Sequence, residues 1–509
     1  MILSIDQGTT GTTVLVINRG GDIVGRAYSE FNQIYPQPGW VSHNADEIWR
    51  STCAVIADAI RNSGIRPCEV AGIGIANQRE TTVIWDRRTG EPVHDAIVWQ
   101  CRRTADLCRR YREQGLEEMV RKKTGLVLDA YFSATKIVWL LENASGLRRR
   151  AEAGDVCFGT IDTYLLYRLT GGAVHATDLT NASRTMCFNI HSREWDPDLL
   201  DAFDIPRAIL PEVHRSAHVF GTTRGAGPLP EGIPIAGIAG DQQAALFGQR
   251  GVSEGDVKNT YGTGCFALFH TGSEAFHSRN GLLTTLACDS RGGTAFALEG
   301  SVFSAGSAVQ WLRDGLGLIA NASETEALAR SVPDNGGVYL VPAFTGLGAP
   351  YWDPDARGTI VGINRGTERA HVARAALESI AYQSAALVDA MTADTGRPVA
   401  VMRVDGGASA NDFLMQFQAD ILDTPVIRPR HTETTALGAA MLAGIATGFW
   451  SGPDALSGLN LPERTFEPSM PKKERDALLN RWRHAVRTAR HHGNPVSREK
   501  EEGRKEKRR

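Results

Sequence analysis

Apolar segments of strand length alternate with polar turns and amphipathic helices along most of this chain. Residues 2–5 and 14–17 are apolar and flank a polar turn, and residues 23–28 continue as a third strand. Residues 70–76 and 233–236 have the same continuous apolar character. Strands that alternate with helices indicate an α/β protein, in which we expect a mostly parallel sheet with helices on both faces.

The strand–turn–strand pattern of the amino terminus recurs in the second half of the chain. Residues 257–260 and 265–269 flank a turn of small residues, and an amphipathic helix covers residues 368–394. The recurrence predicts an internal duplication. Because 509 residues exceed what one core usually serves, we expect domains at 1–250 and 251–455, a helical extension at 456–495 and a disordered charged tail at 496–509.

Charge and composition exclude several classes of protein. A net charge of −3 gives no overall attraction to nucleic acid or membranes. No apolar run is long enough to span a bilayer, and the first residues lack a secretory signal. The eight cysteines are scattered without CxxC spacing, as in reduced proteins. We therefore predict a cytoplasmic protein without nucleic-acid binding or membrane insertion.

Residues 237–248 place one acid between a buried strand and a helix. Gly240 lets the backbone turn before Asp241. Asp241 could be the N-cap of the helix, accepting hydrogen bonds from N–H groups of its first turn. It could instead be a functional carboxylate at the carboxyl end of a strand, where open α/β sheets bind ligands. The local sequence leaves both interpretations open.

Two glycine-rich turns are candidate phosphate sites. Residues 6–13 combine backbone N–H groups, threonine hydroxyls and Asp6, which could cradle phosphate oxygens and orient magnesium. An ordinary hairpin is the alternative, and the turn is not a Walker loop. Gly406-Gly407 joins a strand to a helix amino terminus, which suits a nucleotide, although packing alone also produces such turns.

A charged pair and a tryptophan follow other predicted strands. Arg79 and Glu80 could form a surface ion pair of small effect, or a donor and an acceptor that converge on the hydroxyls of a polyol. Trp99 could be a core side chain or an apolar wall of a binding site.

Long motifs in a fixed order along residues 1–490 resemble those of the FGGY family of carbohydrate kinases, and within it the members that phosphorylate glycerol. These motifs are Asp6-Gln7-Gly8-Thr9-Thr10, Asn77-Gln78-Arg79-Glu80-Thr81-Thr82, Trp99-Gln100-Cys101-Arg102-Arg103, residues 237–248 and 259–266, Asp405-Gly406-Gly407, and the two family signature stretches at 131–140 and 358–378.

The resemblance implies two domains of the actin-like ATPase (ribonuclease H-like) fold, with glycerol and ATP meeting in the cleft between them. It implies ATP- and Mg²⁺-dependent phosphorylation of glycerol to sn-glycerol 3-phosphate, the first step of glycerol catabolism. We also expect a homo-oligomer, either a dimer or a tetramer.

The resemblance also assigns roles residue by residue. Asp241 would be the catalytic base, Asp6 would help to place magnesium, and Trp99 and Phe266 would form an apolar wall against the glycerol carbons. The glycerol-binding residues would be Arg79, Glu80, Trp99, Tyr131, Asp241, Gln242 and Phe266, and the nucleotide-binding residues Thr9, Thr10, Gly11, Thr263, Gly306, Gln310, Gly407 and Asn411.

One departure from the family pattern leaves alternatives open. The first loop of the family commonly continues with serines and an arginine, whereas this chain has Gly11-Thr12-Thr13, so a cation on the phosphate side is missing. A catalytically silent sensor is therefore one alternative. A pentulose or other sugar kinase of the family and an actin-like ATPase without a polyol substrate are the others. The Arg79–Glu80 pair, together with Trp99 and Phe266, favours the smaller triol.

Overall fold

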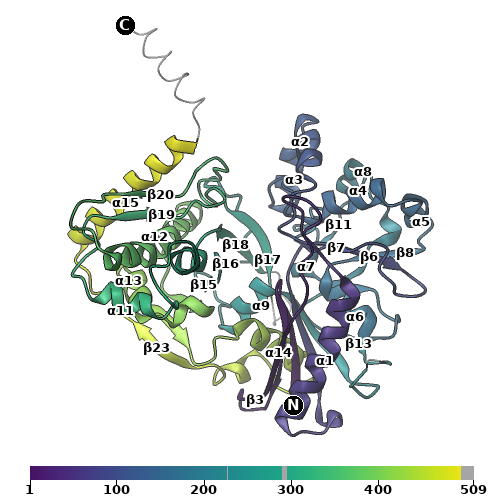
Figure 1. The fold of residues 1–509 in the computed structure, drawn as a ribbon. Coiled ribbons are helices and arrows are strands. Elements are labelled where there is room, and N and C mark those ends of the chain that lie inside the picture. Colours follow the sequence, from purple (N-terminus) through teal and green to yellow (C-terminus); the bar gives the residue numbers. More distant parts are fainter. Residues whose placement is uncertain (226, 289–294, 494–509) are drawn as a thin grey trace.

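Two lobes, each built around its own β-sheet, make up the protein (Figure 1). The computed structural model describes residues 1–225, 227–288 and 295–493. The purple-to-teal first half of the chain forms one lobe, and most of the green-to-yellow second half forms the other. The charged tail predicted at residues 496–509 lies outside the described residues. Within the described residues, no helix is both long and apolar enough to cross a membrane.

The sheet of the first lobe has the strand order β13-β14-β5-β1-β2-β3. Strands β14, β5 and β1 are parallel, whereas β2, β3 and β13 are joined to their neighbours in antiparallel fashion. The strands are β1 (Ile2–Gln7), β2 (Gly11–Ile17), β3 (Ile23–Glu30), β5 (Gly72–Asn77), β13 (Ala217–Thr222) and β14 (Pro234–Gly240).

The sheet of the second lobe has the order β17-β18-β16-β15-β21-β22-β23. Only the β15–β21 and β21–β22 pairs are parallel among its described strands. The strands are β15 (Val257–Tyr261), β16 (Cys265–Gly272), β17 (Leu283–Ala287), β18 (Ala295–Val302), β21 (Met402–Asp405), β22 (Val426–Pro429) and β23 (Pro462–Phe466).

The two sheets share one core topology. The order β3-β2-β1-β5-β14 in the first lobe corresponds to β18-β16-β15-β21-β22 in the second, with the same directions for each pair. The structure therefore shows the internal duplication that the recurring hairpin predicts. The prediction of mostly parallel sheets is wrong, because each half opens with antiparallel strands joined by tight turns.

Short strand pairs and helices complete the lobes. The pairs are β4 (Ser42–His43) with β7 (Ala96–Ile97), β6 (Val83–Asp86) with β8 (Val156–Gly159), β9 (Ala176–Asp178) with β12 (Glu212–His214), β10 (Phe188–Asn189) with β11 (Glu194–Trp195), and β19 (Tyr339–Val341) with β20 (Thr359–Val361). The helices are α1 (Ala45–Ser63), α2 (Ala105–Glu113), α3 (Glu117–Thr124), α4 (Ser133–Asn143), α5 (Leu147–Glu152), α6 (Ile161–Leu169), α7 (Leu179–Ala182), α8 (Pro197–Phe203), α9 (Asp241–Gly248), α10 (Gly306–Gln310), α11 (Glu324–Arg330), α12 (Arg369–Thr395), α13 (Asp412–Leu422), α14 (Thr434–Ala446) and α15 (Lys472–Gly493).

Both faces of the first sheet are buried. Leu3 and Ile5 of β1 point into a core with α1 and α6, whereas Ile2 of the same strand packs in a cluster with α14. Helix α14 therefore covers the first sheet although it comes from the second half of the chain. The helix lies so close that a Cβ at Gly74 would meet the Ala439 carbonyl oxygen at 2.2 Å. Glycine in β5 is thus required by packing.

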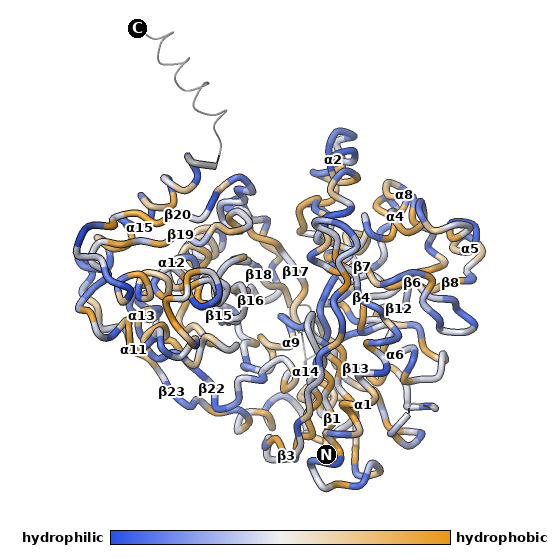
Figure 2. Tube along the Cα trace, in the orientation of Figure 1, coloured by the Kyte–Doolittle hydropathy of each residue, from blue (hydrophilic) through white to orange (hydrophobic). Residues whose placement is uncertain are grey.

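The second lobe has a core of its own, to which the carboxy-terminal helix belongs. Helices α12 and α13 supply much of this core, and Trp482 of α15 stacks on Tyr382 with ring centroids 5.1 Å apart. The buried side chains of the core are mainly apolar, and hydrophilic positions are frequent in the outer loops and helices (Figure 2). The predicted helix of the 456–495 extension exists, and it packs onto this lobe.

Candidate active site

The first lobe brings its polar turns together at one edge of its sheet. In the parallel register, Gln7 at the end of β1 lies beside Asn77 at the end of β5, which lies beside Gly240 at the end of β14. Because parallel strands end at the same edge, the first phosphate turn, the Arg79–Glu80 pair and Asp241 emerge there together. This convergence favours the functional interpretation of Asp241.

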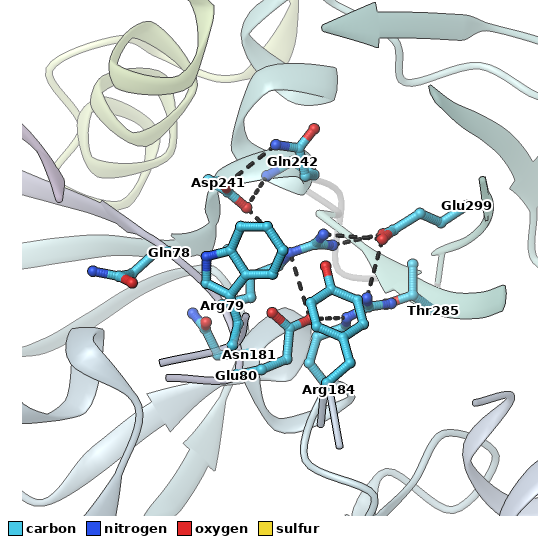
Figure 3. A network of polar contacts seen from close by, with 12 residues as sticks. Gln78, Arg79, Glu80, Asn181, Arg184, Asp241, Gln242, Thr285 and Glu299 are labelled. Carbon is cyan, nitrogen blue, oxygen red and sulfur yellow. Dashed lines mark hydrogen bonds and ion pairs between the residues drawn. The ribbon is translucent and has the colours of Figure 1, made fainter. Parts of the chain in front are cut away.

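Asp241 is the first residue of α9, and Gly240 is its N-cap. The prediction that Asp241 could be the N-cap is therefore wrong. The Asp241 carboxylate accepts hydrogen bonds from the backbone N–H (2.7 Å) and the side-chain amide (3.2 Å) of Gln242, and it lies 3.1 Å from Arg79 Nε. Its side chain is 30% exposed, whereas that of Arg79 is 2% exposed. These contacts fix the carboxylate in place (Figure 3), and part of its surface stays exposed.

Arg79 and Glu80 belong to a buried ion-pair network that joins the two lobes (Figure 3). Arg79 donates to Glu299 of β18 at 2.6 and 3.0 Å, and Arg184 donates to both Glu80 (2.6 Å) and Glu299 (3.0 Å). Each of these side chains is at most 2% exposed. The interpretation of Arg79–Glu80 as a surface ion pair is therefore wrong.

Burial and the arginine charges balance differently on the two glutamates of the network. Burial alone would raise the pKa of Glu299, but the charges of Arg184 and Arg79 outweigh burial and lower the pKa to about 2. Burial raises the pKa of Glu80, against the opposing charges of Arg184 and Arg79. Glu299 is therefore the firmly ionised anchor between the two arginines.

Aromatic side chains stand beside the network. Trp99 meets Tyr131 edge-on with ring centroids 5.5 Å apart, and it meets Phe266 of the other lobe at 6.3 Å. Trp99 is half-buried and lies outside the hydrophobic core clusters of the described residues, so its interpretation as a core side chain is wrong. The aromatic wall and the polar network thus face the same interlobe region.

Thr9 of the first turn is tied to both the aromatic wall and a buried histidine. Trp99 Nε1 donates to Thr9 Oγ1 at 2.8 Å, and Gln33 Nε2 donates to the Thr9 carbonyl at 3.0 Å. Since Gln33 uses its amide N–H there, its Oε1 must accept from His43 Nε2, 2.7 Å away. Thr10 is exposed and Gly11 begins β2. The turn is therefore held rigidly, with Thr10 left open to solvent.

We expect the contribution of His43 and His175 to the free energy of unfolding to fall as pH decreases from about 6.5 to about 4. Burial lowers the pKa of both His43 and His175 from 6.5 to about 4, so the unfolded chain binds more protons across this window. This contribution is thus fully present above pH 6.5 and lost towards pH 4. Urea unfolding of wild type and His43→Gln over this range measures the effect, and the variant should show a shallower decline. If the unfolding free energies of wild type and His43→Gln fell in parallel with pH, the contribution of His43 would be excluded.

The second lobe contributes the other predicted nucleotide residues from the turn after β15, from α10 and from the segment after β21. The carbonyl of Gly262 accepts from the N–H of Gly306 (3.0 Å), and Thr263 accepts from Ser307 (3.1 Å), so this turn packs on the start of α10. Gln310 and Gly407 are exposed. Asn411 caps α13, its Oδ1 accepting from the N–H of Leu414 at 2.9 Å. The structure gives Asn411 a helix-capping role, and its nucleotide role stays a prediction.

Asp6 lies among other carboxylates. Burial, followed by the charges of Asp241, Glu433 and Asp405, raises the pKa of Asp6 well above its usual range. A divalent cation would offset this crowding of negative charge. In the described part of the chain, no three His, Cys, Asp or Glu side chains gather to ligate a metal. A single carboxylate such as that of Asp6 fits magnesium, which commonly uses one or two carboxylates and completes its shell with waters and phosphates.

Comparison with known proteins identifies the family. The profile of the N-terminal domain of the FGGY family of carbohydrate kinases matches residues 1–248, and that of the C-terminal domain matches residues 257–447. The chain belongs to the FGGY family of carbohydrate kinases. The resemblance predicted from the sequence motifs is therefore confirmed.

Relatives of this FGGY kinase share most of its length. Glycerol kinase 2 of Thermotoga maritima is 57% identical over 485 residues, which cover 95% of this chain and 98% of that protein. Glycerol kinase of Deinococcus radiodurans is 57% identical over 489 residues, covering 96% and 97%. The crystal structure of Plasmodium falciparum glycerol kinase with ADP has a TM-score of 0.90 at 38% identity, covering 96% and 98%. This structural match confirms the predicted two-domain, actin-like fold.

Sequence reasoning missed three charged residues of this FGGY kinase. Arg184 lies in a polar loop without a recognised motif, and Glu299 lies within an apolar strand, so neither carries a local signal of its role. Lys258 is fully buried on β15 and contacts Gln242 Oε1 and Thr260 Oγ1, both at 2.5 Å. Burial lowers the pKa of Lys258, against the charges of Asp405 and Asp241. The position of a charged lysine in a predicted strand is the one feature of the sequence that could have indicated a role for Lys258.

Proposed function

We propose that the protein transfers the γ-phosphoryl group of ATP to glycerol and releases sn-glycerol 3-phosphate and ADP. The observation that carries the proposal is the partly open Asp241 carboxylate, held by Arg79 and Gln242 at the strand edge that also presents the first phosphate turn. Relatives that are 57% identical over nearly the full chain are glycerol kinases, which supports glycerol as the acceptor.

The glycerol hydroxyls would bind to the polar network and the carbons to the aromatic wall. Arg79 and Glu80 would offer a donor and an acceptor to neighbouring hydroxyls, and Gln242 and Tyr131 would add further polar groups. Because ion pairs already fix Arg79 and Glu80, binding would require little reorganisation of these side chains. Trp99 and Phe266 would cover the carbon backbone.

Asp241 would accept the proton of the attacking hydroxyl. A primary hydroxyl is a weak nucleophile at neutral pH, and a positioned carboxylate typically contributes about 10²–10⁴-fold. Thr9, Thr10, Gly11 and Thr263 would hold the phosphates from both lobes, and Gly306, Gln310, Gly407 and Asn411 would line the nucleotide. Magnesium, placed through Asp6, would offset the charge of the ATP phosphates. Closure of the lobes would exclude water.

A panel of acceptors tests the proposal. With purified protein and ATP, we expect ADP release to depend on glycerol and to be fastest with it among glycerol, dihydroxyacetone, xylulose and ribulose. A preference for a pentulose would show that the acceptor is a sugar and not glycerol. ATP hydrolysis that no polyol stimulates would favour an actin-like ATPase, and no turnover with any acceptor would favour a silent sensor.

Fold likeness alone does not choose among these acceptors. Xylulose kinase of Lactobacillus acidophilus has a TM-score of 0.87 with 20% identity, which shows only a shared fold. The aromatic wall that Trp99 forms with Tyr131 and Phe266 is, together with the Arg79–Glu80 pair, the local feature that favours a small triol. Pentulose kinases thus remain the alternative that the acceptor panel must exclude.

The Trp99→Phe variant should separate the two contacts of Trp99. Phenylalanine keeps an aromatic wall but lacks the N–H that donates to Thr9 Oγ1. We expect a small rise in the KM for glycerol, and a larger rise in the KM for ATP as the phosphate turn loosens. Steady-state kinetics with each substrate varied measures both. The Trp99→Ala control should raise the KM for glycerol strongly. An unchanged KM for glycerol in Trp99→Ala would show that Trp99 does not form a wall of the glycerol site.

Two further properties belong to this proposal. A cytoplasmic location suits an enzyme that consumes ATP, and fractionation of cells that express the protein would test it. The homo-oligomer expected from the sequence stays a prediction, for which light scattering of the purified protein is the direct measurement.

A further inference from the structure

A cavity outside the residues assigned to glycerol, nucleotide and magnesium lies where the two lobes meet. Its volume is about 240 Å³. The first lobe supplies the segment that follows α9, and the second lobe supplies β21, β22 and the chain entering β23. The lining residues are Gln249, Arg250, Arg403, Ile427, Pro429, Asn460 and Pro462.

Arg403 brings a poorly compensated positive charge to this cavity. Its side chain is half-buried, and its Nε is buried without a hydrogen-bond partner. Arg403 forms no ion pair with the residues that the structure describes. Burial lowers the pKa of Arg403, with the charge of Asp256 opposing and that of Arg250 adding to the effect. Two arginines facing one cavity favour an anionic ligand, because a guanidinium binds phosphate and carboxylate through paired N–H groups.

Gln249 brings a buried acceptor to the same cavity. The residue is 5% exposed, and its Nε2 donates to Asp405 Oδ2 at 2.6 Å. Since a carboxylate can accept but not donate, this bond fixes which amide atom is nitrogen. The other atom, Oε1, is therefore a carbonyl oxygen, and it is buried without a partner. A ligand with a hydroxyl group would satisfy it.

We propose that this cavity is a binding site for a small phosphate ester that also carries a free hydroxyl group. The phosphate lies between Arg403 and Arg250, and the hydroxyl donates to Gln249 Oε1. Arg250 already donates to the Ser457 carbonyl at 2.7 Å through Nη1, which leaves its other N–H groups for the ligand. The site is separate from the proposed phosphoryl transfer, and its ligand is neither ATP nor glycerol.

Isothermal titration calorimetry with 3-phosphoglycerate tests the site on the full chain. Saturating ADP and glycerol are present to occupy the proposed catalytic cleft. We expect saturable 1:1 binding to wild type, and at least about tenfold weaker binding to Arg403→Gln and to Arg250→Gln, because each loses charge-assisted hydrogen bonds. Arg430→Gln is the matched control, since Arg430 is exposed on the same edge and does not line the cavity. It should bind as wild type does.

The hydroxyl contact has its own comparison. Phosphoglycolate, a phosphate ester without a hydroxyl group, should bind wild type more weakly than 3-phosphoglycerate does, and Gln249→Leu should abolish this difference. Circular dichroism reports whether each variant is folded, and the wild-type ligand comparison needs no variant. The proposal is overturned if wild type shows no saturable binding, or if all arginine variants bind equally. Equal binding of the two esters by wild type also overturns it.

Discussion

The Asp241→Asn variant is expected to lose most phosphoryl transfer while keeping its fold. Asparagine cannot take a proton from the glycerol hydroxyl, so kcat should fall by about 10²–10⁴-fold. Its side-chain oxygen can still accept the backbone N–H of Gln242, now 2.7 Å away. Arg79 keeps its two hydrogen bonds to Glu299. Glycerol-dependent ADP release measures kcat, and thermal unfolding measures stability.

A control carboxylate separates catalysis from general charge effects. Asp314 is exposed on the second lobe and pairs with Arg313, so Asp314→Asn removes the same charge away from the site. This control should keep the wild-type kcat, and the KM for ATP should stay within about threefold of wild type in both variants. Near-normal turnover by Asp241→Asn would show that Asp241 is not the general base.

The Glu299→Gln variant should lose both stability and glycerol affinity. Removing the anion leaves Arg79 and Arg184 buried with too little negative charge, and breaking a buried pair costs about 3–5 kcal/mol of unfolding free energy. Because Glu299 holds Arg79 from the opposite lobe, the KM for glycerol should rise at least about tenfold, equivalent to about 1.4 kcal/mol of binding. Urea unfolding and steady-state kinetics measure the two effects.

A second buried glutamate provides the matched control. Glu378 lies in the core of the second lobe, where it pairs with Arg374 at 2.8 Å and accepts from Asn335. Glu378→Gln should lower stability as Glu299→Gln does, but without a specific change in the KM for glycerol. If both variants raised this KM equally, the effect of Glu299 would be one of general destabilisation. The positioning role requires the two variants to differ.

Local patterns predicted the elements that carry the chemistry. The turns between β1 and β2 and between β15 and β16 and the glycine pair at 406–407 lie in the segments that the sequence predicted. The first turn is shorter than the predicted residues 6–13, because β1 extends to Gln7 and β2 begins at Gly11. Helix α12 (Arg369–Thr395) matches the amphipathic segment predicted at 368–394. These features depend on hydrophobic periodicity and on residues that favour turns, which act over a few neighbouring positions.

Interpretations that depended on distant partners were less reliable. The chain could not show that Arg79 is buried rather than exposed, because its partner Glu299 is 220 residues away. It could not show that α14 would cover the sheet of the first lobe. The sheets are mixed rather than mostly parallel for a related reason, since strand direction is fixed by which strands pair and not by the alternation of elements.

The sequence by itself determined the family, the two-domain fold and the identity of the acid at the start of α9. Long ordered motifs and hydrophobic periodicity are properties of the chain, and they need no knowledge of its path in space. Only the tertiary structure decided what surrounds that acid. It placed Arg79 and Gln242 on the Asp241 carboxylate, and it closed the network with Arg184 and Glu299. Such groups have a defined charge and position only when burial and long-range packing fix them together.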